Sequence, residues 1–257
     1  MNFVREGDES MKPDFGRHAY GVAAIVFGAT ALLWHDINKW PEIQAFASPP
    51  YLVAIFYVAA AALVVGGIAI QWRAIAKPGA LALGAVYLLF AILWIPGIIR
   101  APLIYNSWGS VFEQFSIFSG AVIAYSSLAS SGSSSAERVG RIGRLFFGIS
   151  AVSLTLEQAV YLHNTADLVP KWIPPGQMFW AVTTTIAFAL AAIAILSGRQ
   201  ALLASRLLTA MLLLFGILIW IPMLFADPHS HVNWSESAVT LAIAGVAWIL
   251  ADYLGEA

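Results

Sequence analysis

The chain contains no cysteine. This absence excludes dithiol–disulfide redox chemistry, thiolate-bound metal centres and structural disulfides within the chain. The sequence also lacks a G-x-S-x-G nucleophile motif, a phosphate-binding loop, an H-E-x-x-H zinc motif and a dinucleotide fingerprint. Whether the protein is an enzyme stays open at this point, but without a catalytic motif we expect it to be non-catalytic on its own.

Charged residues are also scarce. They make up 11% of the 257 residues, against about 25% in an ordinary soluble domain, and the formal net charge is -1. This balance leaves no broad basic surface for nucleic acid. Hydrophobic residues make up 60% of the chain, and the mean hydropathy is +0.79. A soluble core this large would leave too few polar residues to coat it, so we predict an integral membrane protein whose solvent is lipid.

Eight apolar runs are long enough to cross a bilayer, which takes about 20 residues and tolerates roughly 17. Proline-containing turns separate them. We therefore predict an all-α transmembrane fold, an eight-helix bundle in which small residues, such as those at 59–67, allow close helix contacts. The predicted spans cover residues 18–35, 51–72, 79–99, 109–130, 145–163, 177–196, 204–225 and 236–254.

Lysine and arginine are divided unequally between the two ends of these spans. Ten fall in the N-terminal tail (1–17) and in or beside the loops after the second, fourth and sixth spans, against three in the other loops. Because basic residues favour the cytoplasmic side, we place both termini in the cytoplasm of a bacterium, with the chain in the inner membrane. The tail has no small-residue cleavage site, so we expect a retained tail rather than a signal peptide.

Two phrases in the sequence are nearly the same. LLFAILWIP runs from Leu88 to Pro96, and LLFGILIWIP runs from Leu213 to Pro222. Other residues match in order at an offset of about 125 to 127 residues. Because each half holds four spans, both halves enter the membrane from the same side, which predicts two parallel four-helix repeats. The predicted organisation is a cytoplasmic tail (1–17), repeat A (18–130), a Ser-rich cytoplasmic linker (131–143) and repeat B (144–257).

The tripeptide Trp-Ile-Pro occurs three times, each time near the outer ends of the spans. Tryptophan favours the membrane interface, and proline ends or kinks a helix, so one interpretation is membrane anchoring. The other interpretation is an aromatic rim around a cup on the outer side. That rim would consist of Trp40, Trp94, Trp108, Trp172, Trp220 and Trp234.

Two carboxylates lie inside predicted spans, where charge is costly and usually faces a cavity or the bundle interior. Each is followed by glutamine, in the pairs Glu113–Gln114 and Glu157–Gln158. One interpretation is structural, with the glutamates paired to Arg100 or hydrogen-bonded to Tyr161 and the glutamines. The other is functional, with the glutamates serving proton transfer or lining a quinone-sized pocket.

A third interpretation concerns the outer loop before the last span. His229-x-His231 with Glu236 offers nitrogen and oxygen ligands for zinc or copper. Loop histidines are usually solvated, so the same residues can also be ordinary surface groups.

The pattern of these spans resembles the DoxX-like family of bacterial membrane proteins, which are four-helix units, some arranged as fused pairs. The resemblance rests on Arg17-x-x-x-Gly21, on LLFAILWIP followed by Ala-Pro, on the stretch from Asn106 to Glu113, and on residues 233–252. It implies a redox-associated subunit, since the family is named from a subunit of a thiosulfate:quinone oxidoreductase. It supplies no catalytic residues, and the absence of cysteine argues against a thiol relay.

From these features we expect an integral membrane protein that serves as an accessory subunit of a quinone-linked redox complex, with quinone as its cofactor. The alternatives are a small-molecule transporter or binding protein that uses the seam between the repeats, and an outer-face metal binder. The expected partners are the lipid bilayer and redox subunits, without nucleic acid.

Overall fold

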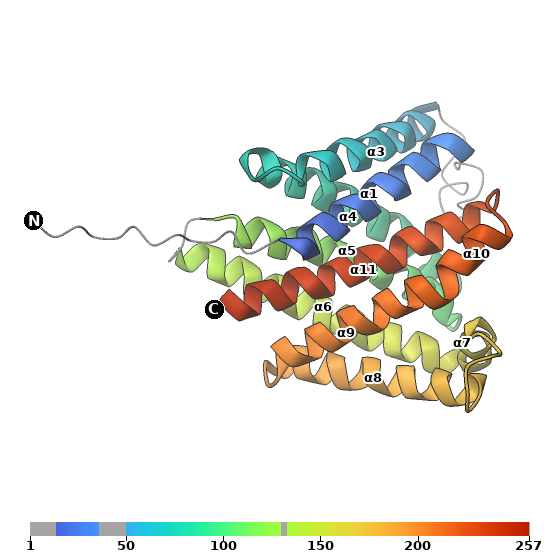
Figure 1. The fold of residues 1–257 in the computed structure, drawn as a ribbon. Coiled ribbons are helices and arrows are strands. Elements are labelled where there is room, and N and C mark those ends of the chain that lie inside the picture. The colour runs from blue at the N-terminus through green and yellow to red at the C-terminus, as the bar shows by residue number, and fades with distance from the viewer. Residues whose placement is uncertain (1–13, 36–49, 130–132, 257) are drawn as a thin grey trace, which may run out of the picture.

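The structure is a computed structural model that describes residues 14–35, 50–129 and 133–256. Over these residues the chain is all-helical, without β-strands, as the sequence predicts for a helical bundle (Figure 1). The long helices are α1 (Phe15–Trp34), α3 (Pro50–Ala69), α4 (Ala76–Arg100), α5 (Tyr105–Ser127), α6 (Ser134–Val160), α8 (Gln177–Ser197), α9 (Ala201–Phe215) and α11 (His231–Glu256). The short elements are η2 (Arg73–Ile75), α7 (Leu162–Leu168), the π-helix η3 (Gly216–Trp220) and α10 (Ile221–Ala226).

Several of these helices are long and apolar enough to cross a membrane, so the chain is a multi-pass membrane protein. A helix of 20 residues is about 30 Å long, which matches the hydrocarbon core of a bilayer. Each of the eight predicted spans overlaps one of the long helices. The five segments that meet the length and hydropathy needed for a span are Arg73–Arg100, Ser134–Val160, Gln177–Ser197, Ala201–Ala226 and His231–Gly255.

Helices extend beyond the predicted spans where polar residues precede the apolar run. Thus α5 begins at Tyr105 and α6 begins at Ser134, both ahead of the apolar stretches. Ser133 caps α6, because its side chain accepts a hydrogen bond from the backbone amide of Ala136 (3.4 Å). Most of the predicted linker (131–143) therefore belongs to the first turns of α6.

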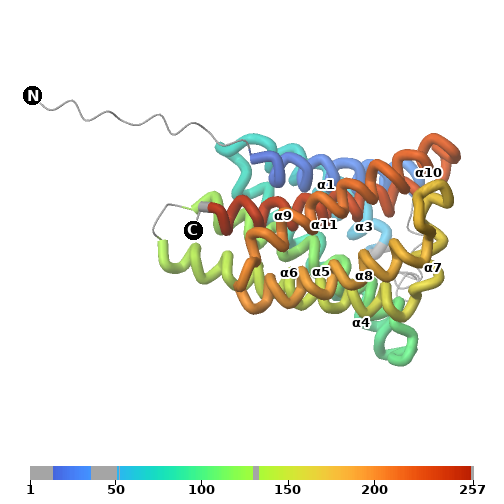
Figure 2. The backbone as a smooth tube through the Cα atoms, turned by 60° about the horizontal axis from the view of Figure 1, so that its bottom comes forward, coloured from blue at the N-terminus to red at the C-terminus, as the bar shows by residue number. Residues whose placement is uncertain are grey.

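The long helices lie side by side, and their ends fall into two groups (Figures 1 and 2). The start of α1, the start of α6, the end of α11 and the turns α3–α4 and α8–α9 lie at one end, with α7 and α10 at the other. The segments at the first end carry most of the lysines and arginines, among them Arg17, Arg73 and Arg199. We call it the basic end, and we call the other the opposite end.

Packing contacts in the first half of the chain recur in the second half. α1 packs on α3 as α6 packs on α8, and α4 packs on α5 as α9 packs on α11. The two halves meet where α1 lies on α11, where α6 lies on α5, and where α5 contacts α11. Gly16 packs closely against Ile249 in the first of these seams, and Gly143 against Ile123 in the second. Corresponding positions are separated by about 126 residues, within the offset of the sequence matches.

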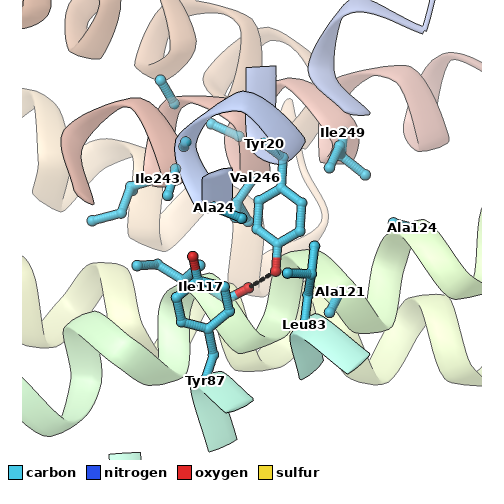
Figure 3. Close-up of a cluster of buried hydrophobic side chains, with 14 of the residues drawn as sticks. Tyr20, Ala24, Leu83, Tyr87, Ile117, Ala121, Ala124, Ile243, Val246 and Ile249 are labelled. Atoms are coloured by element: carbon cyan, nitrogen blue, oxygen red, sulfur yellow. Dashed lines mark hydrogen bonds between the residues drawn. The ribbon is translucent and has the colours of Figure 1, made fainter. Parts of the chain in front are cut away.

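The core lies between the two halves and is centred on Tyr20 (Figure 3). Tyr20 is fully buried on α1, and its ring packs near that of Tyr87, with centroids 6.2 Å apart. Its hydroxyl donates a hydrogen bond to the carbonyl oxygen of Ile117 on α5 (3.0 Å). Since a buried hydroxyl without a partner is costly, this bond favours the position of Tyr20 in the core and links α1 to the backbone of α5.

A charged cluster ties the basic end together. The carboxylate of Asp14 accepts hydrogen bonds from Arg17 (2.7 Å) and from Arg73 (3.1 Å). Arg17 is buried and also donates to the carbonyl oxygen of Ile70. Burial raises the pKa of the Asp14 carboxyl, but the hydrogen bonds from Arg73 and Arg17 outweigh it and hold the pKa below the ordinary value of 3.8.

Candidate ligand pocket

A cavity of about 1050 Å³ lies mainly among the helices of the second half and reaches α5 of the first, toward the opposite end. Its walls come from α5, α6, α8, α9, η3 and α11, with α7 and Trp94 of α4 completing it. This volume is at the upper end of the range usual for small-molecule sites. Most lining residues are apolar or aromatic, as is typical of sites that bind organic molecules.

Three glutamates from three helices line the cavity. They are Glu113 of α5, Glu157 of α6 and Glu236 of α11. One oxygen of Glu113 accepts a hydrogen bond from the side-chain amide of Gln114 (3.1 Å). Within the described residues, no lysine, arginine or histidine forms an ion pair with any of the three. Carboxylates inside an apolar membrane protein that have no positive side chain beside them cost free energy, so these three are candidates for a functional role.

The seam between α5 and α6 fixes the position of Glu157. A Cβ built on Gly109 of α5 would overlap both carboxylate oxygens of Glu157, so this carboxylate lies directly on the glycine. Near this contact, the hydroxyl of Tyr105 meets that of Ser153 (3.0 Å). The backbone amide of Asn106 donates to the hydroxyl of Tyr161 (3.2 Å). Because any Cβ at position 109 would displace this carboxylate, the glycine is matched to the observed position of Glu157.

Aromatic side chains form much of the remaining wall. They are Trp94, Tyr161, Trp180, Phe188, Phe215 and Trp220. The indole N–H of Trp180 donates to the carbonyl oxygen of Pro174 (3.0 Å), which orients the ring. Trp108 and Trp234 make the same bond to Pro102 (3.0 Å) and Pro228 (2.9 Å). The spacing Pro-x5-Trp is therefore a signal that could have identified Trp180, which sequence reasoning missed.

The π-helix η3 forms part of the cavity wall and explains a difference between the two repeated phrases. The second phrase is one residue longer than the first. An extra residue in a helix is commonly accommodated as a π-turn, often at a functional site. In the first phrase α4 continues as an α-helix through Pro96, whereas in the second the π-helix stands directly before α10, which holds Pro222. Neither proline ends its helix, and the extra residue lies where the cavity is.

The predicted polar residues separate into those that line the cavity and those that do not. Glu113, Glu157, Gln158 and Tyr161 all line it. Gln158 accepts a hydrogen bond from the hydroxyl of Thr185 (3.3 Å). Gln114 is buried beside Glu113 but is not part of the wall. Arg100 is exposed at the end of α4 and pairs with neither glutamate among the described residues.

Only part of the predicted tryptophan rim lies at the cavity. Trp94 and Trp220 line it. Trp172 is 73% exposed, and Trp108 and Trp234, although bonded to proline carbonyls as Trp180 is, are not among the lining residues. Trp40 lies outside the described residues.

The predicted metal ligands point to different surroundings. Glu236 lines the cavity, whereas a ring nitrogen of His231 lies 3.1 Å from the hydroxyl of Ser235. The backbone amide of His229 donates to Asp227 (3.1 Å). In the part of the chain that the structure describes, no three histidine, aspartate or glutamate side chains gather closely enough to hold a metal ion.

No protein-family model matches the chain, and neither a curated protein nor a solved structure does. The functional interpretation therefore depends on the geometry of the pocket.

Proposed function

We propose that this multi-pass membrane protein binds a small organic cation in the pocket between α5, α6, α8 and α11, as a transporter or binding protein. The observation that carries the proposal is the set of three carboxylates in an aromatic cavity. Among the described residues, no lysine, arginine or histidine lines this cavity or pairs with the three carboxylates. Carboxylates attract a positive charge strongly where water is scarce. The faces of tryptophan and tyrosine rings add cation–π attraction, so the carboxylates and the aromatic lining favour the same class of ligand.

The ligand class follows from both parts of the pocket. The wall contributed by Trp94, Trp180 and Trp220 suits an apolar or aromatic body, and the cavity of about 1050 Å³ gives it room. The carboxylates suit a quaternary or protonated nitrogen, or another compact positive centre. An anionic ligand would find no positive side chain in the described wall, and any ionised carboxylate there would repel it, since like charges placed together cost several kcal/mol.

The competing proposal is a quinone-linked accessory subunit of the DoxX-like kind, with redox partner subunits. The aromatic wall is compatible with a quinone ring, but quinone carbonyls accept hydrogen bonds and therefore need donors. The wall holds some donors, such as Asn106 and Thr240, but the three carboxyl groups are its distinctive feature and support a cation more directly. Zinc or copper at His229 and His231 is a separate proposal, and elemental analysis of the purified protein tests it.

For the architecture, we propose two parallel four-helix repeats whose eight long helices all cross the membrane. The recurrent helix contacts and the Trp-to-Pro hydrogen bonds at the same offset support this arrangement. The gathering of lysine and arginine at the basic end supports cytoplasmic termini in a bacterial inner membrane. The pocket then opens toward the outer side of that membrane.

The test uses tetraphenylphosphonium, a permanently charged aromatic cation, in equilibrium dialysis against the purified protein in a neutral detergent. We expect saturable binding that weakens roughly tenfold or more in Glu157→Gln, which keeps the shape of the side chain but removes its charge. The matched control is Glu137→Gln, because Glu137 is exposed on the same helix at the basic end. Absence of saturable binding, or equal losses in the two variants, contradicts the proposal.

A further inference from the structure

We propose that the pocket exchanges its organic cation for protons held by Glu113, Glu157 and Glu236, so that cation binding drives proton release. This inference rests on the proposed function and adds a coupled activity to it. The observation behind it is the charge balance of the cavity without a ligand.

The charge balance is set by every element that forms the wall. α5 contributes Glu113, α6 contributes Glu157, and α11 contributes Glu236. The phenol of Tyr161, directly after α6, is the remaining titratable group of the wall. The lining residues from α4, α7, α8, α9 and η3 carry no carboxylate, imidazole, ammonium or guanidinium group. No positive side chain among the described residues therefore offsets the three carboxyl groups.

Three ionised carboxylates in one such cavity are unfavourable in free energy. Each loses hydration on burial, and each repels the other two, so a group in this position takes up a proton when no cation is near. An arriving cation reverses the balance, because it attracts the ionised form and not the neutral acid. The step is then one carboxylic acid plus one cation giving a carboxylate–cation pair, and the proton passes to water.

The three groups lie at different depths from the opposite end. Glu157 lies about 5 Å from the end of α6, Glu236 about 8 Å from the start of α11, and Glu113 about 12 Å from the start of α5, at 1.5 Å per residue. A proton released beside Glu157 has the shortest path to the outer side. Glu113, beside the buried Gln114, is the deepest site and the last to exchange.

The experiment measures protons and cation together. Tetraphenylphosphonium is added to the detergent-purified protein in weakly buffered solution with a pH indicator, and its affinity is measured from pH 5.5 to pH 8. We expect close to one proton released per cation bound, and an affinity that rises by up to tenfold per pH unit where the release is complete.

Variants separate the proton-donating groups from the rest of the chain. We expect Glu157→Gln, Glu113→Gln or Glu236→Gln to reduce the protons released per cation, and Glu137→Gln to leave the ratio unchanged. Saturable binding with no proton release and a pH-independent affinity overturns the exchange but leaves the proposed function standing. Absence of saturable binding overturns both. Wild-type proton release in all three pocket variants also overturns the exchange.

Discussion

Gly109→Ala is the most specific perturbation of the pocket that the structure offers. The added methyl group would overlap the carboxylate oxygens of Glu157. Since these atoms are the tip of a flexible side chain, the glutamate can rotate away without moving the helices. Alanine also favours a helix over glycine by about 0.5–1 kcal/mol. We therefore expect little net change in stability but a displaced carboxylate.

The size of the binding effect follows from Coulomb's law. At an effective dielectric constant of about 20, a cation about 4 Å from a carboxylate gains about 4.2 kcal/mol, and at about 6 Å it gains about 2.8 kcal/mol. A displacement of about 2 Å therefore costs about 1.4 kcal/mol, which is a tenfold loss of affinity. The assay is dialysis of tetraphenylphosphonium, with thermal melting in detergent as the measure of stability.

A matched glycine and a double variant make this prediction refutable. Gly216 lies in η3 at the same pocket, and an added Cβ there meets nothing within 4 Å, so Gly216→Ala should bind as the unmodified protein does. If Gly109 acts through Glu157, then Gly109→Ala has no further effect in a Glu157→Gln background. Undiminished affinity in Gly109→Ala, or an equal loss in both backgrounds, refutes the reasoning.

Three other predictions test separate parts of the structure. Deletion of Ile219 gives the second phrase the length of the first and should convert η3 to α-helix, which turns α9 by about 100° relative to α10. The circular dichroism spectrum should stay helical while cation binding is lost. Retained binding would exclude η3 from the site. Tyr20→Phe removes the core hydrogen bond and should cost about 1 kcal/mol, seen as a lower melting temperature with unchanged cation affinity; an unchanged melting temperature would contradict the role of that bond. Asp14→Asn should lower the melting temperature at pH 7. Because hydrogen bonds from Arg73 and Arg17 outweigh burial and lower the pKa of Asp14, its contribution is present above the ordinary value of 3.8 and is lost as pH falls through the lowered value. The difference between Asp14→Asn and the unmodified protein should therefore disappear in strong acid, and a difference that persists there would contradict this linkage.

The helical membrane fold could be predicted because a long apolar run in lipid satisfies its backbone hydrogen bonds by forming a helix. The presence of Glu113 and Glu157 inside such runs also indicated groups facing the interior, and the structure places both at one cavity. The helix ends were less predictable, since hydropathy detects only the apolar part of a helix. The polar first turns of α6 illustrate this, because Ser133 caps a helix where the sequence suggested a linker.

The rest of the site depends on which face of each helix meets which neighbour. Glu236 was grouped with His229 and His231 by proximity in sequence, but along α11 it shares a face with Val239 and Thr240, which also line the cavity. Pairing of the glutamates with Arg100 was one interpretation of the sequence, but α4 continues through Pro96 and leaves Arg100 exposed. The π-helix could be found only by noticing the extra residue in the second phrase.

The central claim is that the pocket selects its ligand by positive charge. The most direct test compares tetraphenylphosphonium with tetraphenylborate, an anion of nearly the same shape and apolar surface, by dialysis against the same purified protein. The account predicts saturable binding of the cation and at least tenfold weaker binding of the anion, with the difference reduced in Glu157→Gln. Equal binding of the two ions would show that the pocket recognises only their aromatic surface, which contradicts the account.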